Sequence, residues 1–373
     1  MKKVMRRVLI TANTYYQLIL AMQLKNTLLK KDYVTLMLSD HNNNSENVYI
    51  KLKEVDFFDE VIFVKSKGVI HNRKWYKKIS EVLQLSLSGT NGYEFYLKDI
   101  KNRYYDEFIN YNLEIDTYAL HAILATYNKN IKYSSYEEGI LSYNNIFYDS
   151  GKFKLIRKIR KMLHKPTILD AYDTFYCLYP NMYEGELNAV KIPPISVGDK
   201  KLIDTTEYIF QVKKDVDYGK YKCIYFESVY DMEGRGIGEK EIVLKIAEKI
   251  GKDNILIKKH PRSDDMSYEK MGMDIDNNSS VPFEVIQLNN DLSNCVLVSA
   301  MTGSVLSINA MVEKPSESWM IYPLTNYKKI DSLVSFSANV EKVIKRMQSV
   351  GYFDYVDIIE NEEEFSQKFE KLL

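Results

Sequence analysis

The segment Asn254-Ile-Leu-Ile-Lys-Lys-His-Pro-Arg262 joins a short apolar run to a turn that carries a histidine and an arginine. The run up to Lys258 predicts a buried strand of a parallel sheet, because such strands are nearly continuous stretches of Val, Ile and Leu. Ligands of open α/β sheets bind outside the carboxyl ends of the strands. His260, Pro261 and Arg262 are therefore candidate ligand-binding residues.

A second strand, predicted at Cys295–Ser299, leads into the turn Thr302-Gly303-Ser304 and then into an apolar helix. Hydroxyl groups and backbone N–H groups at the start of a helix form an anion site. Between the two strands, Pro282-Phe283-Glu284 holds a carboxylate just after a proline turn. Imidazole, guanidinium, hydroxyls and a fixed carboxylate together suit a nucleotide monophosphate, with the carboxylate on its ribose or base.

Short apolar strands alternate with helical patterns along most of the chain, which predicts parallel sheets covered on both faces. Strands are expected at Arg7–Ala12, Tyr33–Leu38, Val61–Val64, Glu94–Leu97, Ile131–Ser135 and Lys222–Ser228, and helices at Leu18–Leu28, Glu46–Leu52, Trp75–Leu87, Thr117–Tyr127, Gly238–Ile250, Phe283–Asn289, Glu341–Met347 and Glu362–Leu372. Pro193-Pro194 and Gly198 interrupt the pattern between Tyr183 and Asp204. We therefore expect two Rossmann-like domains, at 1–190 and 205–373.

The composition excludes several classes of protein. Fifty-one Lys and Arg balance 51 Asp and Glu, which argues against a nucleic-acid binder. Three scattered cysteines form neither a disulfide framework nor a C-x-x-C metal pattern. Polar residues interrupt the N-terminal apolar run too early for a signal peptide, and no run is long enough to span a bilayer. We therefore expect a cytoplasmic protein.

Two acidic segments are candidates for a general base. Glu137-Glu138-Gly139 ends a predicted strand, and adjacent carboxylates can raise one pKa and supply a base near neutral pH; an acidic surface turn is an equal interpretation. Asp231 and Glu233 lie in a glycine-containing loop after the strand Lys222–Ser228, and such a loop can close over a substrate. The sequence does not decide between the two segments.

The stretch 151–165 carries seven Lys or Arg and no acid, with apolar residues at helical spacing. This pattern predicts a basic amphipathic helix. Such a helix either packs on its own protein or lies on an anionic membrane surface. Peripheral membrane contact through 151–165 is thus one of two interpretations.

The order of these motifs resembles the bacterial sialyltransferases, and most closely glycosyltransferase family 52, the lipooligosaccharide and capsule sialyltransferases. Glu137-Glu138-Gly139 matches their acidic-acidic-glycine motif, His260-Pro261 their His-Pro motif and Thr302-Gly303-Ser304 their serine/threonine motif. Thr14-Tyr15-Tyr16-Gln17 is similar to their N-terminal Thr-Pro-x-Gln, with tyrosine in place of proline.

The resemblance implies a GT-B fold, with an acceptor-side N-terminal domain and a CMP-sugar-binding C-terminal domain facing across a cleft. It implies an inverting, metal-independent transfer of sialic acid from CMP-sialic acid to a galactose-type hydroxyl of a surface glycan such as capsule or lipooligosaccharide.

The resemblance also implies roles for individual residues. His260 would assist departure of CMP. The base would be Glu138 (or Glu137) or Asp231 (or Glu233). Residues expected to contact the donor are Pro261, Arg262, Pro282, Phe283, Glu284, Thr302, Gly303 and Ser304, and those expected on the acceptor side are Asn13, Gln17 and Glu137.

Alternatives remain for the activity and its partners. A CDP-glycerol or CDP-ribitol polyol-phosphate transferase would also use a His-Pro turn, and a capsule-assembly protein could bind CMP without turnover. Asp215-Val-Asp217 and Asp274-Ile-Asp276 have the D-x-D pattern of metal-dependent glycosyltransferases, but such pairs arise freely in a highly charged chain, so no metal ligand is assigned. A homodimer is compatible with the sequence and not specified by it.

Overall fold

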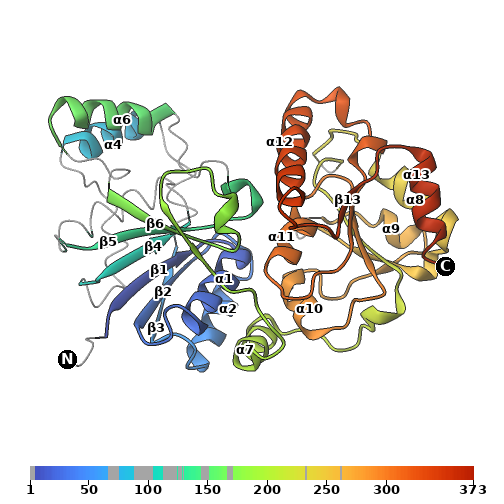
Figure 1. Ribbon diagram of the computed structural model, residues 1–373, viewed down its shortest axis with the longest axis horizontal. Helices are drawn as coiled ribbons and strands as arrows, with labels where there is room; N and C mark the ends of the chain where they lie inside the picture. The colour runs from blue at the N-terminus through green and yellow to red at the C-terminus, as the bar shows by residue number, and fades with distance from the viewer. Residues whose placement is uncertain are drawn as a thin grey trace. The chain divides into compact units, whose positions relative to one another are not determined.

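The computed structural model describes residues 5–65, 75–87, 104–111, 124, 128, 130–143, 151–165, 171–231, 233–260 and 263–373. The chain divides into two compact units, which we call unit 1 (Met1–Pro193) and unit 2 (Pro194–Leu373). Each unit is built on one sheet with helices packed on it (Figure 1).

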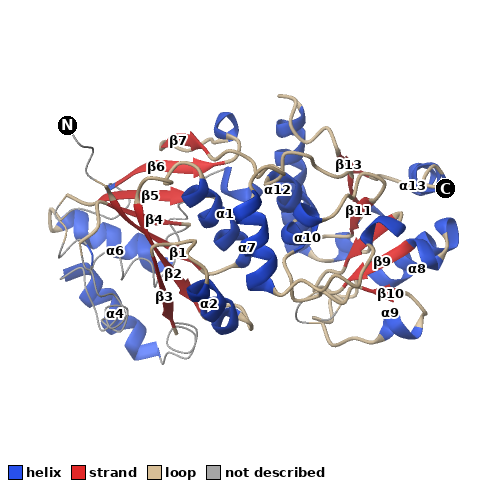
Figure 2. Ribbon diagram, turned by 90° about the horizontal axis from the view of Figure 1, so that it is seen from below, coloured by secondary structure: helices blue, strands red, loops and turns tan. Residues whose placement is uncertain are grey.

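The sheet of unit 1 has seven strands in the order β3-β2-β1-β4-β5-β6-β7, and every pair is parallel. The strands are β1 (Arg7–Ala12), β2 (Tyr33–Ser39), β3 (Glu60–Val64), β4 (Glu107–Asn110), β5 (Lys132–Tyr136), β6 (Tyr172–Cys177) and β7 (Asn188–Lys191). The α-helices are α1 (Tyr15–Asn26), α2 (Ser45–Glu54), α4 (Trp75–Leu87) and α6 (Gly151–Met162). Helices α1 and α2 lie on one face of the sheet and α4 and α6 on the other (Figures 1 and 2).

The sheet of unit 2 has six strands in the order β10-β9-β8-β11-β12-β13, again all parallel. The strands are β8 (Cys223–Phe226), β9 (Ile255–Lys258), β10 (Asp274–Ile275), β11 (Val296–Ser299), β12 (Ser318–Met320) and β13 (Val356–Ile358). The α-helices are α7 (Lys200–Phe210), α8 (Glu239–Ile250), α9 (Ser267–Lys270), α10 (Phe283–Asn289), α11 (Ser304–Ala310), α12 (Asp331–Gln348) and α13 (Glu362–Glu370).

Local sequence explains where the first helix begins. Thr14 is the N-cap of α1, and its hydroxyl accepts the backbone N–H of Gln17 at 3.2 Å. The side-chain carbonyl of Gln17 accepts the N–H of Thr14 at 3.0 Å in return. This capping box satisfies two N–H groups that a helix start otherwise leaves unpaired. Because α1 is buried from Gln17 to Leu24, its apolar side chains form part of the core.

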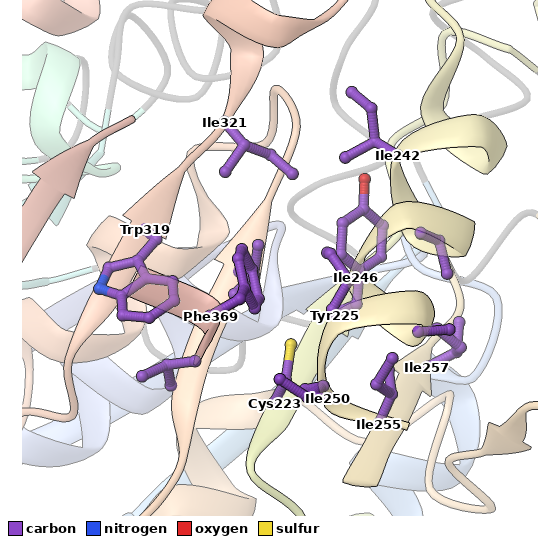
Figure 3. Packing of buried hydrophobic residues seen from close by; sticks show 14 of the residues in the cluster. Cys223, Tyr225, Ile242, Ile246, Ile250, Ile255, Ile257, Trp319, Ile321 and Phe369 are labelled. Carbon is purple, nitrogen blue, oxygen red and sulfur yellow. The ribbon is translucent and has the colours of Figure 1, made fainter. Parts of the chain in front are cut away.

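The core of unit 2 lies between the sheet and its helices (Figure 3). Trp319 of β12 meets Phe369 of α13 edge to face, with ring centroids 5.0 Å apart. Cys223 lies in the same cluster, and Cys177 and Cys295 are also buried free thiols. Burial raises the pKa of the Cys295 thiol to about 12 and that of Cys223 well above its usual value.

The structure confirms the expected α/β architecture and corrects parts of the strand assignment. The strands that were not predicted are β4, β6, β7, β10, β12 and β13, and β7 lies in the stretch that we expected to be irregular. The strand expected at Glu94–Leu97 and nearly all of the helix expected at Thr117–Tyr127 lie outside the described residues. No helix among the described residues is both long enough and apolar enough to cross a bilayer.

Candidate active site

The strand order of unit 2 fixes where a ligand site lies. From β8 the chain proceeds to β9 and β10 on one side, and it then returns to β11 on the other side of β8. Such a reversal opens a crevice at the carboxyl ends of the two central strands. Because neighbouring strands are about 4.8 Å apart, the ends of β9 and β11 are separated by roughly 10 Å across β8. The structure therefore brings the His260 turn and the Thr302-Gly303-Ser304 turn to one edge of one sheet.

The backbone of His260 is held by a carboxylate at the end of the central strand. His260 follows β9, and its N–H donates to Glu227 Oε2 at 3.0 Å. Glu227 follows β8, is 6% exposed, and its N–H donates to the carbonyl of Lys258 at 3.0 Å. Burial raises the pKa of the Glu227 carboxyl, and the His260 N–H opposes that rise. Glu227 thus fixes the start of the His-Pro turn.

The turn after β11 is built by hydroxyl groups. The Ser299 hydroxyl accepts the N–H of Thr302 at 2.9 Å, and the Thr302 and Ser304 hydroxyls are 3.0 Å apart. Gly303 is the N-cap of α11, and a Cβ added there would meet no heavy atom within 4 Å. The hydroxyls of Thr302 and Ser304 therefore lie close together just after the carboxyl end of β11, which pairs with β8.

Glu284 lies in the first turn of α10, next to a buried lysine. It is 9% exposed; burial raises the pKa of its carboxyl, and the Lys258 ammonium opposes that rise. Pro282 is the N-cap of α10. Phe283 packs edge to face on Phe226 of β8, with centroids 4.8 Å apart, so the structure places this ring in the core.

Lys258, at the end of β9, ties that strand to the segment before α10. Its ammonium group lies 3.0 Å from Asp276 Oδ2 and donates to the carbonyl of Val281 at 3.0 Å and to that of Asn278. Burial lowers the pKa of Lys258, while the neighbouring carboxylates raise it. A buried cation needs this complete set of partners. The end of β9 therefore holds the segment that leads into Glu284 and α10, and it also leads into His260.

The loop between β8 and α8 is closed by two carboxylates. Asp231 accepts the N–H groups of Ile237 at 2.6 Å and Glu239 at 3.1 Å. Glu239, 1% exposed, accepts the N–H of Ser228 at 2.8 Å, its hydroxyl at 2.7 Å and the hydroxyl of Tyr225 at 2.9 Å. Burial raises the pKa of Glu239 to about 7. Both oxygens of Asp231, a candidate base, already accept backbone hydrogen bonds.

In unit 1 the two adjacent glutamates differ sharply in environment. Glu137 is 1% exposed and accepts the Tyr16 hydroxyl at 2.5 Å, the Leu178 N–H at 2.8 Å and the Tyr143 hydroxyl. Burial raises the pKa of Glu137, and these three donors oppose that rise. Glu138 is exposed and follows directly, before Gly139 with a φ of 129°. The pair thus consists of a buried anchor and an exposed carboxylate.

Asn13 and Gln17 lie at the reversal point of the unit 1 sheet, between β1 and β4. Asn13 donates from its N–H to Gln17 Oε1 at 2.7 Å and from its side chain to the Tyr111 hydroxyl after β4. Gln17 is fully buried. Both residues thus support the turn next to Thr14, and their expected place on the acceptor side stays a prediction.

The structure leaves some expected residues undescribed and adds others. Pro261 and Arg262 lie outside the described residues. Glu227, Glu239 and Lys258 had no role in the sequence analysis, although Glu227 could have been recognised as the first acidic residue after the central strand. The roles of Glu239 and Lys258 could not be recognised in this way, because they depend on burial and on partners distant in sequence.

The D-x-D segments do not form a shared carboxylate cluster. Asp274 accepts the Tyr221 hydroxyl at 2.9 Å and pairs with Lys220 at 3.2 Å, while Asp276 pairs with Lys258. Among the described residues, no group of three or more His, Cys, Asp or Glu is arranged to hold a metal ion.

The family model described as alpha-2,8-polysialyltransferase matches residues 8–306. This match begins in β1, ends in α11 and includes every motif described above. The chain belongs to the alpha-2,8-polysialyltransferase family. It is therefore a bacterial-type sialyltransferase, and its general activity is glycosyl transfer. A search of curated proteins found no match.

Solved structures are similar to this sialyltransferase in fold. The glycotransferase of kitacinnamycin matches with a TM-score of 0.52 at 10% identity, over 99% of this chain and 91% of that one. MnaA of S. aureus, solved with UDP, matches with a TM-score of 0.47 at 12% identity, over 99% and 88%. The UDP-GlcNAc 2-epimerase of Methanocaldococcus jannaschii matches with a TM-score of 0.47 at 11% identity, over 98% and 92%.

These comparisons refine the initial expectations. The GT-B fold class and the sialyltransferase assignment are confirmed. The family that matches is the polysialyltransferase family, and the finer resemblance to glycosyltransferase family 52 stays a prediction.

Proposed function

We propose that this sialyltransferase uses CMP-sialic acid as donor and transfers sialic acid, with inversion and without a metal ion, to a galactose-type hydroxyl of a bacterial surface glycan such as capsule or lipooligosaccharide. The observation that carries the proposal is the shared sheet edge in unit 2. There His260, Glu227 and the Thr302-Gly303-Ser304 turn follow three neighbouring parallel strands.

In the proposed reaction, a carboxylate removes the proton of the acceptor hydroxyl. The resulting oxygen attacks the anomeric carbon of sialic acid as the bond to the CMP phosphate breaks. His260 donates a proton or a hydrogen bond to the departing phosphate, and Thr302, Gly303 and Ser304 hold it. Glu284, which lies near the Lys258 ammonium, accepts hydrogen bonds from the ribose or the cytosine.

Glu138 is the better candidate for the base. Glu138 is exposed at the end of β5, whereas both oxygens of Asp231 accept N–H groups that close the β8–α8 loop. A base must reach the acceptor hydroxyl within hydrogen-bond distance. If Asp231 acted as the base, it would have to give up its hydrogen bonds with Ile237 and Glu239, and the β8–α8 loop would open.

The test is release of CMP from CMP-sialic acid, with and without a galactose-terminated acceptor, in the presence of EDTA. We expect acceptor-stimulated release. His260→Ala should lower turnover by about 10²–10³-fold, the loss typical of one donor to a developing anion, and should weaken CMP binding much less. His164→Asn, at an exposed histidine, is the matched control.

Two results would contradict the proposal. Equal losses in CMP affinity and turnover for His260→Ala would remove its role in leaving-group departure. Release of CMP from CDP-glycerol but not from CMP-sialic acid would identify a polyol-phosphate transferase.

A further inference from the structure

Helix α4 exposes an apolar face to solvent. Five large side chains are exposed on it: Trp75 (73%), Tyr76 (50%), Ile79 (52%), Leu83 (52%) and Leu87 (55%). At about 100° per residue these positions fall within an arc of roughly 120°. Isolated exposed apolar residues are common, but five large apolar side chains exposed on one side of a single helix mark an interaction surface.

Helix α6 packs beside α4 and carries exposed positive charge. The two helices lie together on the face of the sheet away from α1 and α2 (Figures 1 and 2). The ammonium group of Lys165, just after α6, donates to the carbonyl of Leu87 at the end of α4. Leu155 (49%), Met162 (72%), Lys158 and Lys161 are exposed on α6. We call the exposed residues of these two helices the α4–α6 surface.

The charge on α6 is local rather than a property of the whole chain. Its sequence GKFKLIRKIRKM contains six Lys or Arg and no acid, whereas the chain as a whole has 51 residues of each sign. Concentrated cations beside exposed apolar and aromatic groups match the chemistry of an anionic bilayer interface. The cations meet lipid headgroups, Trp and Tyr occupy the boundary, and Ile and Leu enter the acyl region.

We propose that the α4–α6 surface docks this enzyme on an anionic lipid bilayer. A soluble polyanion such as an acidic glycan would pair with the lysines but would give no reason to expose Ile79, Leu83 and Leu87. The apolar arc on α4 therefore selects the bilayer over the polyanion. This inference is independent of the donor and of the catalytic residues.

The test is sedimentation of the full chain with phosphatidylcholine vesicles, with and without phosphatidylglycerol. We expect binding that needs phosphatidylglycerol and weakens with salt. The pair Ile79→Asp/Leu83→Asp should lower the partition coefficient at least tenfold, and Lys158→Glu/Lys161→Glu should lower it by about tenfold or more. The control pair Lys30→Glu/Lys31→Glu, exposed after α1, should leave it unchanged.

Intrinsic fluorescence gives a second measurement that does not depend on sedimentation. Trp319 is 2% exposed in unit 2, so a blue shift on adding vesicles should come from Trp75 and vanish in Trp75→Phe. CMP release with a soluble acceptor verifies that each variant is folded. The proposal is overturned if the wild type does not bind the anionic vesicles, or if Ile79→Asp/Leu83→Asp binds them as the wild type does. Binding of a soluble acidic glycan in place of vesicles would identify a glycan surface and refute it as well.

Discussion

Replacing Glu239 by glutamine should change how the stability of unit 2 depends on pH. Burial raises the pKa of Glu239 from 4.5 to about 7. The folded state therefore favours the protonated form of Glu239. The stability that this preference contributes is fully present below 4.5, the pKa of Glu239 in the unfolded chain, and is lost as pH rises through about 7. A shift of this size corresponds to about 3 kcal/mol of unfolding free energy.

Glutamine can keep the contacts of Glu239 without its titration. Its carbonyl can accept the N–H of Ser228 and the hydroxyl of Tyr225, and its NH2 group can donate to the Ser228 hydroxyl, which rotates freely. The unfolding free energy of Glu239→Gln relative to that of the wild type should therefore rise by about 3 kcal/mol between about pH 5 and about pH 8.

The assay is urea unfolding, followed by tryptophan fluorescence in a Trp75→Phe background. The chain has two tryptophans, and this background leaves Trp319, in the core of unit 2, as the only reporter. Glu241→Gln, at an exposed position in the same helix turn, is the matched control. Parallel pH profiles for Glu239→Gln and the wild type would refute the reasoning, because they would mean that Glu239 stays ionised in the folded state.

Three further predictions concern the carboxylates near the candidate site. Glu138→Gln should lower turnover by about 10²–10⁴-fold at unchanged CMP affinity, whereas Asp231→Asn should mainly lower the thermal unfolding midpoint. If instead Asp231→Asn lowered kcat and Glu138→Gln lowered the melting temperature, the base would be Asp231. Glu137→Ala should destabilise unit 1 by about 2–4 kcal/mol, measured by denaturant unfolding, since the three donors that converge on that carboxylate would lose their acceptor; a wild-type midpoint would contradict its anchoring role. Glu227→Ala should release the backbone of His260 and lower kcat by about tenfold or more, and kinetics identical to those of the wild type would show that the turn needs no such support.

Apolar runs were sufficient to predict the central strands, and polar strands were missed. β1 (RVLITA) and β9 (ILIK) are mainly apolar and almost entirely buried. β4 has the sequence EFIN, and its Glu107 looks like a surface residue in sequence. In the fold Glu107 is 1% exposed, because Arg6 pairs with it at 3.0 Å and the Tyr176 hydroxyl donates to it at 3.0 Å. Such partners are far apart in sequence, so the local pattern cannot reveal them.

The same limit applies to the candidate site. The turns after β9 and β11 could be predicted, because strand ends in a parallel sheet converge whatever the connecting sequence is. The difference between Glu137 and Glu138 could not, since it depends on hydroxyls that Tyr16 and Tyr143 bring from other elements. Nor could the local sequence show that Asp231 closes a loop through the N–H groups of Ile237 and Glu239.

The buried cysteines make this chain convenient for labelling at chosen positions. The thiolate is the reactive form, and burial raises the pKa of all three thiols. Maleimide reagents should therefore pass over the native cysteines in the folded protein. A single cysteine introduced on α4 or α6 would carry a dye without a cysteine-free background, and the probe could report directly on whether that helix enters a bilayer.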